Sequence, residues 1–448
     1  MLEGRSCFVS RAFPGSCDQE SNWAFMTFRL DLKLSDGKRR LDDVDVEEIE
    51  NGAVRKASKM SDPVEGFRRI QLNAGPLSRE LVHQRSGNQR QTGNSSDSDN
   101  LIHSLGRDIS INCILRCSRA DYGSLASLNR GFRSLIRSGE IYKLRRMNGI
   151  IEHWVYFSCH LLEWDAFDPA TRLWMHLPRM SSNDCFMCSD KESLAVGTEL
   201  LVFGKGVDSY VTYRYSILTN SWSSGMRMNA PRCLFGSASL GEIAILAGGI
   251  DSQRTIYSSA ELYDSEKKTW TTLPCMNKPR KMCSAVFMDG KFYVIGGIGA
   301  NGVLTCGEEF DLQTKTWKEI PNMSPVRSGA AQENEAPAAA EAPPLVAVVN
   351  NQLYAADHAD MEVRKYNKVT KTWVTVGRLP ERADSMNGWG LAFRACGDRL
   401  IVIGGRRTVG DGTIEVNSWV PNDGPPQWDL LARKRSGNFV YNCAVMGC

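Results

Sequence analysis

Six tryptophans recur at nearly regular intervals through the C-terminal two thirds of the chain. They stand at Trp174, Trp222, Trp270, Trp317, Trp373 and Trp428, with successive intervals of 48, 48, 47, 56 and 55 residues. A period of about 40 to 50 residues is typical of β-propellers, in which each repeat forms one four-stranded blade. The spacing therefore predicts a mainly β fold, a six-bladed β-propeller over residues 151–448.

Two further features recur with the same period as the tryptophans. An aromatic residue stands seven positions before five of them, and in most repeats a short apolar run ends in glycine, as in VIGG at 294–297. Glycine lets the backbone approach a neighbour closely or turn with positive φ, where a side chain would clash. We therefore expect the glycines to mark a blade's inner end and the aromatic residues to pack on its two outer strands.

The first repeat lacks a first strand. HWVYFSC, LLEWDAF and RLWMHL can serve as its second to fourth strands, whereas the stretch NFVYNCAVMGC follows the last tryptophan without a blade of its own. We predict that this C-terminal stretch pairs beside residues 153–159 and closes the ring. Closure would remove an open sheet edge.

The segment 98–148 has a helical pattern instead. Apolar residues share a face in three places: Ile111, Ile114 and Leu115; Leu125, Leu128, Phe132 and Leu135; and Ile141 and Leu144. Asp108 and Ser138 are suited to cap helices at their N-termini. Three helices this short cannot bury all of their apolar surface, so we expect the bundle to pack on a partner or on the next domain.

Residues 1–97 are polar and contain few apolar clusters. Such a segment cannot offset the entropy lost on ordering, so we expect a disordered tail. The chain has no apolar run of 18 residues and its N-terminus lacks a secretory pattern, which predicts no membrane span and a location in the nucleus or the cytoplasm. A net charge of +3 over 448 residues argues against binding of nucleic acid.

Metal and catalytic motifs are weak. Cys185 and Cys188 form a CxxC pair, but a structural zinc site needs two further ligands at comparable spacing, and none is found. Asp357, His358 and Asp360 have the side chains of metal ligands, and a solvated turn is the alternative explanation. The sequence has no phosphate-binding glycine loop, nucleophile elbow or triad. We expect no cofactor, no metal and no catalytic activity.

The double glycine, the spaced aromatic residue and the tryptophan together resemble kelch repeats. The segment LIHSLGRDISINCILRCSRADYGSLASLNRGFRSLIRSGEIYKLRRM, residues 101–147, resembles an F-box, in which Leu105-Gly106 stands where Leu-Pro is usual. The order of the two is that of the plant F-box/kelch-repeat family, and EIYKLRRMNGIIEHWVYFSC is especially similar to its Skp-interacting members.

This resemblance implies a substrate receptor of an SCF-type cullin-RING ubiquitin ligase, itself not an enzyme. The F-box would bind a Skp-type adaptor, and through it cullin, while the kelch propeller would bind the protein to be ubiquitinated. A scaffold that binds partners without any ligase is the alternative, because fold does not determine function.

Adaptor binding would use apolar residues of the helical segment. The candidates are Leu105, Ile109, Ile114, Leu115, Leu125 and Leu128. Helical spacing does not separate an exposed stripe from a buried one, so packing within the bundle or against the propeller is the alternative for each of them.

Five arginines stand near the start of a blade's first strand. Arg232, Arg280 and Arg327 each follow a tryptophan by ten residues, and Arg382 and Arg435 follow theirs by nine and seven. Rotational symmetry would gather them around one mouth of the central channel, where guanidinium groups can bind carboxylates or phosphates in bidentate fashion. We therefore expect a substrate with an acidic or phosphorylated segment. The alternative is that these arginines pair with local Asp or Glu and are solvated.

Overall fold

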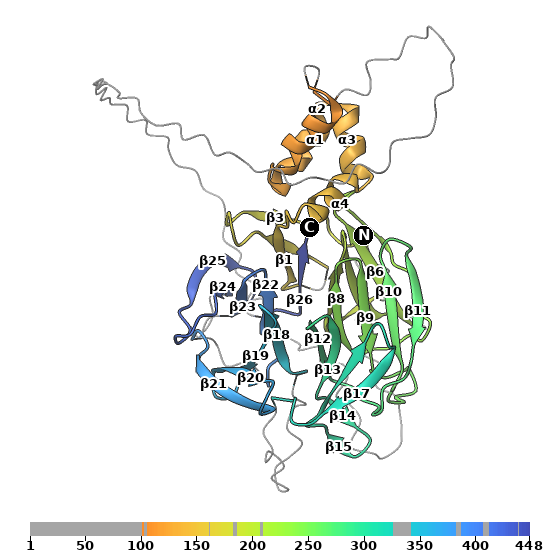
Figure 1. The fold of residues 1–448 in the computed structure, drawn as a ribbon, viewed down its shortest axis with the longest axis vertical. Helices are drawn as coiled ribbons and strands as arrows, with labels where there is room; N and C mark the ends of the chain where they lie inside the picture. Colours follow the sequence, from red (N-terminus) through yellow and green to blue (C-terminus); the bar gives the residue numbers. More distant parts are fainter. Residues whose placement is uncertain are drawn as a thin grey trace, which may run out of the picture. The chain divides into compact units, whose positions relative to one another are not determined.

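A computed structural model describes residues 101–102, 105–160, 162–181, 186–206, 209–325, 342–381, 387–405, 412–437 and 439–448. The predicted tail of residues 1–97 lies outside this part of the chain. Helices come first and strands follow, with the chain's C-terminus beside α4 (Figure 1). No helix in the described part is long and apolar enough to cross a membrane.

The helical segment begins at Arg107 and ends at Met147. Its described elements are α1 (Arg107–Leu115), the 3-10 turn η2 (Arg119–Asp121), α2 (Tyr122–Leu128), α3 (Arg130–Arg137) and α4 (Glu140–Met147). The expected N-cap Asp108 is wrong, because Gly106 precedes α1. Gly139 precedes α4 with φ 79°, and the hydroxyl of the expected Ser138 accepts the N–H of Glu140, the first residue of α4, at 3.3 Å. Glycine is suited to Gly139 because a positive φ is unfavourable for residues that carry a Cβ.

The predicted second helix is in fact two helices, α2 and α3. Asn129 between them has an extended backbone, with φ −154° and ψ 172°, and its side-chain oxygen accepts a hydrogen bond of 2.8 Å from the N–H of Phe132. Asparagine is a favoured N-cap, so this residue ends one helix and begins the next. Leu128 therefore does not share a continuous helical face with Phe132.

The strands of the described residues form six four-stranded antiparallel sheets. Blade 1 holds β26 (Asn442–Gly447), β1 (His153–Ser158), β2 (Asp165–Phe167) and β3 (Trp174–His176); blade 2 holds β4 (Met187–Val196), β5 (Glu199–Lys205), β6 (Tyr210–Ser216) and β7 (Ser221–Ser224); blade 3 holds β8 (Gly236–Leu240), β9 (Ile243–Ala247), β10 (Ala260–Asp264) and β11 (Thr269–Leu273).

The second half of the ring repeats this order. Blade 4 holds β12 (Ser284–Met288), β13 (Lys291–Ile295), β16 (Gly307–Asp311) and β17 (Thr316–Ile320), with the added hairpin β14 (Ile298–Gly299) and β15 (Gly302–Val303); blade 5 holds β18 (Leu345–Val349), β19 (Gln352–Asp357), β20 (Glu362–Asn367) and β21 (Thr372–Arg378); blade 6 holds β22 (Ala392–Cys396), β23 (Arg399–Gly405), β24 (Thr413–Trp419) and β25 (Asp429–Arg435). The six-bladed propeller is confirmed.

The C-terminal strand closes the ring, as predicted. β26 pairs antiparallel with β1 from His153 opposite Gly447 to Ser158 opposite Asn442. Strands from the two ends of the propeller therefore form one blade. This pairing leaves no free edge at β1.

The aromatic residues join strands and blades. Five of the tryptophans on fourth strands lie opposite the aromatic residue of the third strand, with ring centroids 4.7 to 5.4 Å apart. The indole N–H of Trp270 also donates to the carbonyl of Met226 in the preceding blade at 3.2 Å, and that of Trp317 donates to Pro274 at 2.8 Å. The repeated tryptophan thus holds neighbouring blades together.

The double glycines end second strands, one strand away from the axis. Gly248 and Gly249 follow β9 with φ 74° and 93°. A Cβ on Gly248 would collide with the carbonyl oxygen of Arg280, and one on Gly249 with that of Cys233. Both reasons for glycine, positive φ and close approach, therefore apply at this pair.

Candidate functional site

The helices and the propeller share one hydrophobic core. Leu135 and Tyr142 of the helices belong to the same buried cluster as Trp154 of blade 1 and Tyr215 of blade 2. The bundle thus buries part of its apolar surface against the next domain. Shared burial of this kind holds two parts of a chain in one orientation.

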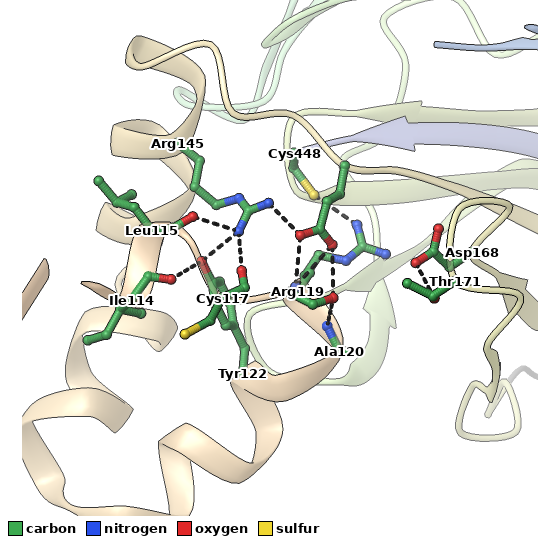
Figure 2. A network of polar contacts seen from close by, with 12 residues as sticks. Ile114, Leu115, Cys117, Arg119, Ala120, Tyr122, Arg145, Asp168, Thr171 and Cys448 are labelled. Carbon is green, nitrogen blue, oxygen red and sulfur yellow. Dashed lines mark hydrogen bonds and ion pairs between the residues drawn. The ribbon is translucent and has the colours of Figure 1, made fainter. Parts of the chain in front are cut away.

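A buried arginine ties the helices to one another and to the propeller (Figure 2). The Arg145 guanidinium is almost fully buried and donates to the carbonyls of Leu115 at 3.2 Å and Cys117 at 2.8 Å. It also donates to the hydroxyl of Tyr122 at 3.0 Å and forms an ion pair of 2.7 Å with Glu152, which precedes β1. Three of these acceptors lie around Nη1, which carries two N–H groups, so two of them share one hydrogen.

A second arginine extends this network to the C-terminal strand (Figure 2). The backbone N–H of Arg119 donates to Glu152 at 3.0 Å. Its guanidinium donates to the hydroxyl of Tyr156 at 2.8 Å and to Sγ of Cys448 at 2.9 Å, and it lies 4.6 Å from the ring centroid of Trp154. Strand β1 and the residue that follows β26 therefore both contact η2.

Basic residues of α4 reach the turns of blade 3. Arg146 pairs with Glu242 in the turn between β8 and β9, and Lys143 pairs with Glu266 in the turn between β10 and β11 at 2.8 Å. Both turns lie at the end of the propeller where first strands pass to second strands, which we name the helical end. The opposite end, where each blade connects to the next, we name the connector end.

The predicted adaptor residues divide into two groups. Ile109 and Leu128 are 56% and 67% exposed, and Leu105 and Leu125 are partly buried. Ile114 and Leu115 are buried in the core of the bundle, so the expectation that they contact an adaptor directly is wrong. Their buried apolar side chains stabilise the bundle instead.

Arg232 and Arg280 are buried and paired, not open to the channel. The Arg232 guanidinium forms an ion pair of 2.7 Å with Glu261, and the Arg280 guanidinium one of 2.6 Å with Glu308. Arg280 also donates to the carbonyl of Gly296 at 3.0 Å. Burial lowers the pKa of Arg232, although the charge of Glu261 opposes this shift. The expected ring of open guanidinium groups is therefore wrong at these two positions.

Of the other three arginines, the structure describes Arg435. Arg435 ends β25, the outermost strand of blade 6, where it is exposed and lies opposite Thr413. Arg327 and Arg382 lie outside the described residues. The expectation that Arg435 faces the channel mouth is wrong, because the outermost strand of a blade lies far from the central axis of the ring.

A cavity of about 570 Å³ lies on the axis of the ring, and first strands of all six blades line it. Small side chains such as Ala195, Ser237 and Ala285 face much of it. Toward the connector end the lining includes Lys191 of β4 and Arg394 of β22. Sequence reasoning missed both, although a charged run, DKE at 190–192, within a first strand was a visible signal.

An irregular segment of β4 places these charges. The pairing of β4 with β5 shifts register between Cys188 and Ser193, which leaves the residues between them outside the regular ladder. Burial raises the pKa of Asp190 to about 6, and burial together with the neighbouring charge of Arg394 lowers the pKa of Lys191 to about 7.

Comparisons with known proteins agree with this architecture. The Kelch motif family model matches residues 231–277 and 279–324. The chain is 62% identical to the F-box/kelch-repeat protein SKIP11 of Arabidopsis thaliana and 58% identical to the F-box/kelch-repeat protein At1g26930 of the same plant, each over 100% of both chains. The chain belongs to the F-box/kelch-repeat protein family. The helices of residues 107–147 fit its F-box, and the six blades form its kelch propeller.

In this F-box/kelch-repeat protein the possible metal ligands near Asp357 lie in a hydrogen-bonded turn. Asp357 pairs with Arg364 at 2.6 Å, and its carboxylate accepts the backbone N–H groups of Ala359 and Asp360 in a turn. Within the described residues, no three His, Cys, Asp or Glu side chains are placed to hold a metal ion. Cys185 lies outside the described part of the chain.

Glu192 should make the stability of this F-box/kelch-repeat protein depend on pH. Burial raises its pKa to about 8, although the backbone N–H of Leu234 opposes this shift. A raised pKa gives stability that is complete below the unfolded value of about 4.5 and is lost as pH rises toward 8. We expect E192Q, which does not titrate, to gain on the order of 2 kcal/mol over wild type between pH 5 and 7.

Urea unfolding at pH 5, 6 and 7 measures this difference. The control is E163Q, at an exposed carboxyl, which should follow the wild-type curve at every pH. Parallel pH profiles for E192Q and wild type would show that the Glu192 carboxyl ionises normally.

Proposed function

We propose that this chain is the substrate-recognition subunit of an SCF-type cullin-RING ubiquitin ligase. Its F-box binds a Skp-type adaptor, its propeller binds the protein to be ubiquitinated, and the chain itself catalyses no reaction. We further propose that it works in the nucleus or the cytoplasm. The observation that carries the proposal is the fixed attachment of an F-box with exposed apolar residues to one end of a kelch propeller.

The arrangement of the two parts supports a receptor. The helices contact turns at the helical end of the propeller, through Arg146 and Lys143 of α4. A partner at Ile109 or Leu128 therefore leaves the connector end accessible to a second protein. The shared core and the buried Arg145–Glu152 pair keep the two binding regions in one orientation.

Gly106 is compatible with an F-box despite its departure from the usual proline. It has φ −61° and ψ 161°, close to the angles that proline adopts. A Cβ at this position would meet no atom within 4 Å. The backbone before α1 thus has the same course that a proline would give it.

Adaptor binding distinguishes the receptor from the alternative, a scaffold without ligase function. We expect the double variant I109D/L128D to lose at least tenfold in affinity for a Skp-type adaptor, because charge would replace apolar contact area at the interface. Both side chains are mostly exposed, so the fold should remain intact. Titration calorimetry with purified adaptor measures the affinity, and a pull-down tests whether cullin follows.

V303D is the matched control, because Val303 on the β14–β15 hairpin is 61% exposed and lies in the propeller. It should bind adaptor like wild type. Deleting the F-box is a poorer test, since the shared core would expose Trp154 of the propeller. Failure of the wild-type chain to bind adaptor would favour the scaffold.

A further inference from the structure

The axial cavity has the size of a ligand site. Its volume of about 570 Å³ falls within the range of about 300 to 1,000 Å³ that is usual for ligand pockets. Small residues on the first strands keep it open, among them Ala347 of β18 and Ala444 of β26. Side chains that project from these strands can therefore reach a group that enters from the connector end.

Two cationic side chains project into this part of the cavity from strands on either side of β26. Lys191 comes from β4 and Arg394 from β22. The ammonium of Lys191 donates to the carbonyl of Leu391 at 2.6 Å, and the guanidinium of Arg394 donates to those of Cys443 at 2.9 Å and Phe393 at 3.2 Å. All of these acceptors are uncharged.

The pairing of these two cations differs from that of the other arginines inside the propeller. Arg232 and Arg280 each have a buried glutamate partner, and Arg146 at the helical end of the cavity pairs with Glu242. Within the described part of the chain, neither Lys191 nor Arg394 has a carboxylate within ion-pair distance. Cations that lose solvent in a protein are usually paired with an anion. Because Lys191 and Arg394 contact only uncharged acceptors among the described residues, we expect an anion from outside the chain to bind them.

The two carboxylates nearest in sequence do not supply that anion. Glu192 is directed to blade 3, where it accepts the backbone N–H of Leu234. Asp190 forms no ion pair with Lys191, and burial raises the pKa of this aspartate to about 6. At neutral pH Asp190 is therefore mostly ionised and its charge acts on Lys191, but neither Asp190 nor Glu192 lies within ion-pair distance of Lys191 or Arg394.

Electrostatics and shape both favour an anion here. Burial, and next the charge of Arg394, lower the pKa of Lys191 to about 7, so an anion between the two would offset their repulsion. A void of about 10 Å³ between Lys191, Arg394 and Cys443 has room for one water molecule. A larger group must therefore sit in the main cavity, where Trp389 places its ring 5.9 Å from the Lys191 ammonium.

We propose that the connector end of the axial cavity binds a carboxylate or phosphate group between Lys191 and Arg394. The inference rests on the proposed receptor function and names the chemistry of the group that the propeller receives. The anion is supplied either by a free small molecule or by a side chain of the substrate protein. Both sources present the same charged oxygens to the ammonium and the guanidinium.

Calorimetry on the full chain tests this site with three probes at constant ionic strength. Inorganic phosphate and citrate represent free anions, and hexaglutamate represents carboxylates on a polypeptide. We expect at least one probe to bind and K191Q and R394Q each to weaken it at least tenfold. K191R, which keeps the charge, should retain most of the affinity. K267Q, at an exposed lysine on an outer turn, should bind like wild type.

The outcomes are distinguishable. Binding of phosphate or citrate that K191Q and R394Q weaken supports a free anion, and the same pattern for hexaglutamate alone supports a substrate side chain. Equal binding by wild type and both variants, or no binding of any probe by wild type, overturns the site. Melting curves without probe verify that each variant is folded. Adaptor binding should be unchanged in K191Q and R394Q, so this result and that for the receptor function are independent.

Discussion

Removal of residues 437–448 should abolish cooperative folding of the propeller or lower its melting temperature by more than about 15 °C. β26 is the innermost strand of blade 1, and it pairs with β1 along its whole length. Its side chains Cys443, Ala444 and Met446 are buried, as is Cys448, which follows it. Burial of a methionine side chain contributes about 1.5 to 3 kcal/mol and each buried CH2 group of the smaller side chains about 0.8 kcal/mol, against a total stability of about 5 to 15 kcal/mol. Circular dichroism melts measure the change.

A single substitution separates ring closure from the contact between Cys448 and Arg119. C448A removes the thiol that accepts from Arg119, but it keeps β26 and the hydrogen bond from Arg119 to Tyr156. We expect C448A to lose about 1 to 2 kcal/mol and to melt cooperatively. If the truncated chain melted within a few degrees of wild type, β26 would not be the strand that holds the ring closed.

The repeat architecture could be predicted because each of its signals occurs several times. A tryptophan on a fourth strand, its aromatic neighbour on the third and a glycine pair after the second recur with one period, so errors at single positions do not matter. Closure by the C-terminal strand followed from counting strands in the first and last repeats.

The helices were harder to predict from the sequence because a single residue determines where one helix ends and the next begins. Asn129 has no special place in the apolar pattern, yet its cap divides one expected helix into two. The apolar pattern also predicted Ile114 and Ile109 equally as adaptor contacts, although Ile114 is buried in the bundle and Ile109 is mostly exposed. Periodicity identifies an apolar face but does not say whether that face is covered.

The candidate site was least predictable because its charges depend on partners distant in sequence. Glu308 follows Arg280 by 28 residues, and strands β12 and β13 and the β14–β15 hairpin lie between them in the sequence. A search for acidic residues on third strands would have found this pairing. Lys191 and Arg394 are farther apart still, on strands whose neighbour β26 comes from the end of the chain. Their proximity follows from ring closure rather than from any local pattern.

The buried pair in blade 4 gives a second large expected effect: R280M should destabilise the chain by about 3 to 5 kcal/mol. The substitution leaves the Glu308 carboxylate buried without its cation, and it removes the donor to the carbonyl of Gly296. An unpaired buried charge is unfavourable because low-polarity surroundings solvate it poorly. The midpoint of urea unfolding, read with the slope of the transition, measures the loss.

R435M is the matched control, since Arg435 is exposed on the outermost strand of blade 6 and should change stability by less than about 0.5 kcal/mol. E308Q adds a second comparison, because it removes the charge of Glu308 and leaves one side-chain oxygen, so that only one of the backbone N–H groups of Asn277 and Lys278 keeps its acceptor. If R280M were as stable as wild type and yet failed to bind anionic probes, Arg280 would belong to the binding site after all. A large loss of stability in R280M and E308Q, with none in R435M, would show that the buried arginine holds blade 4 together.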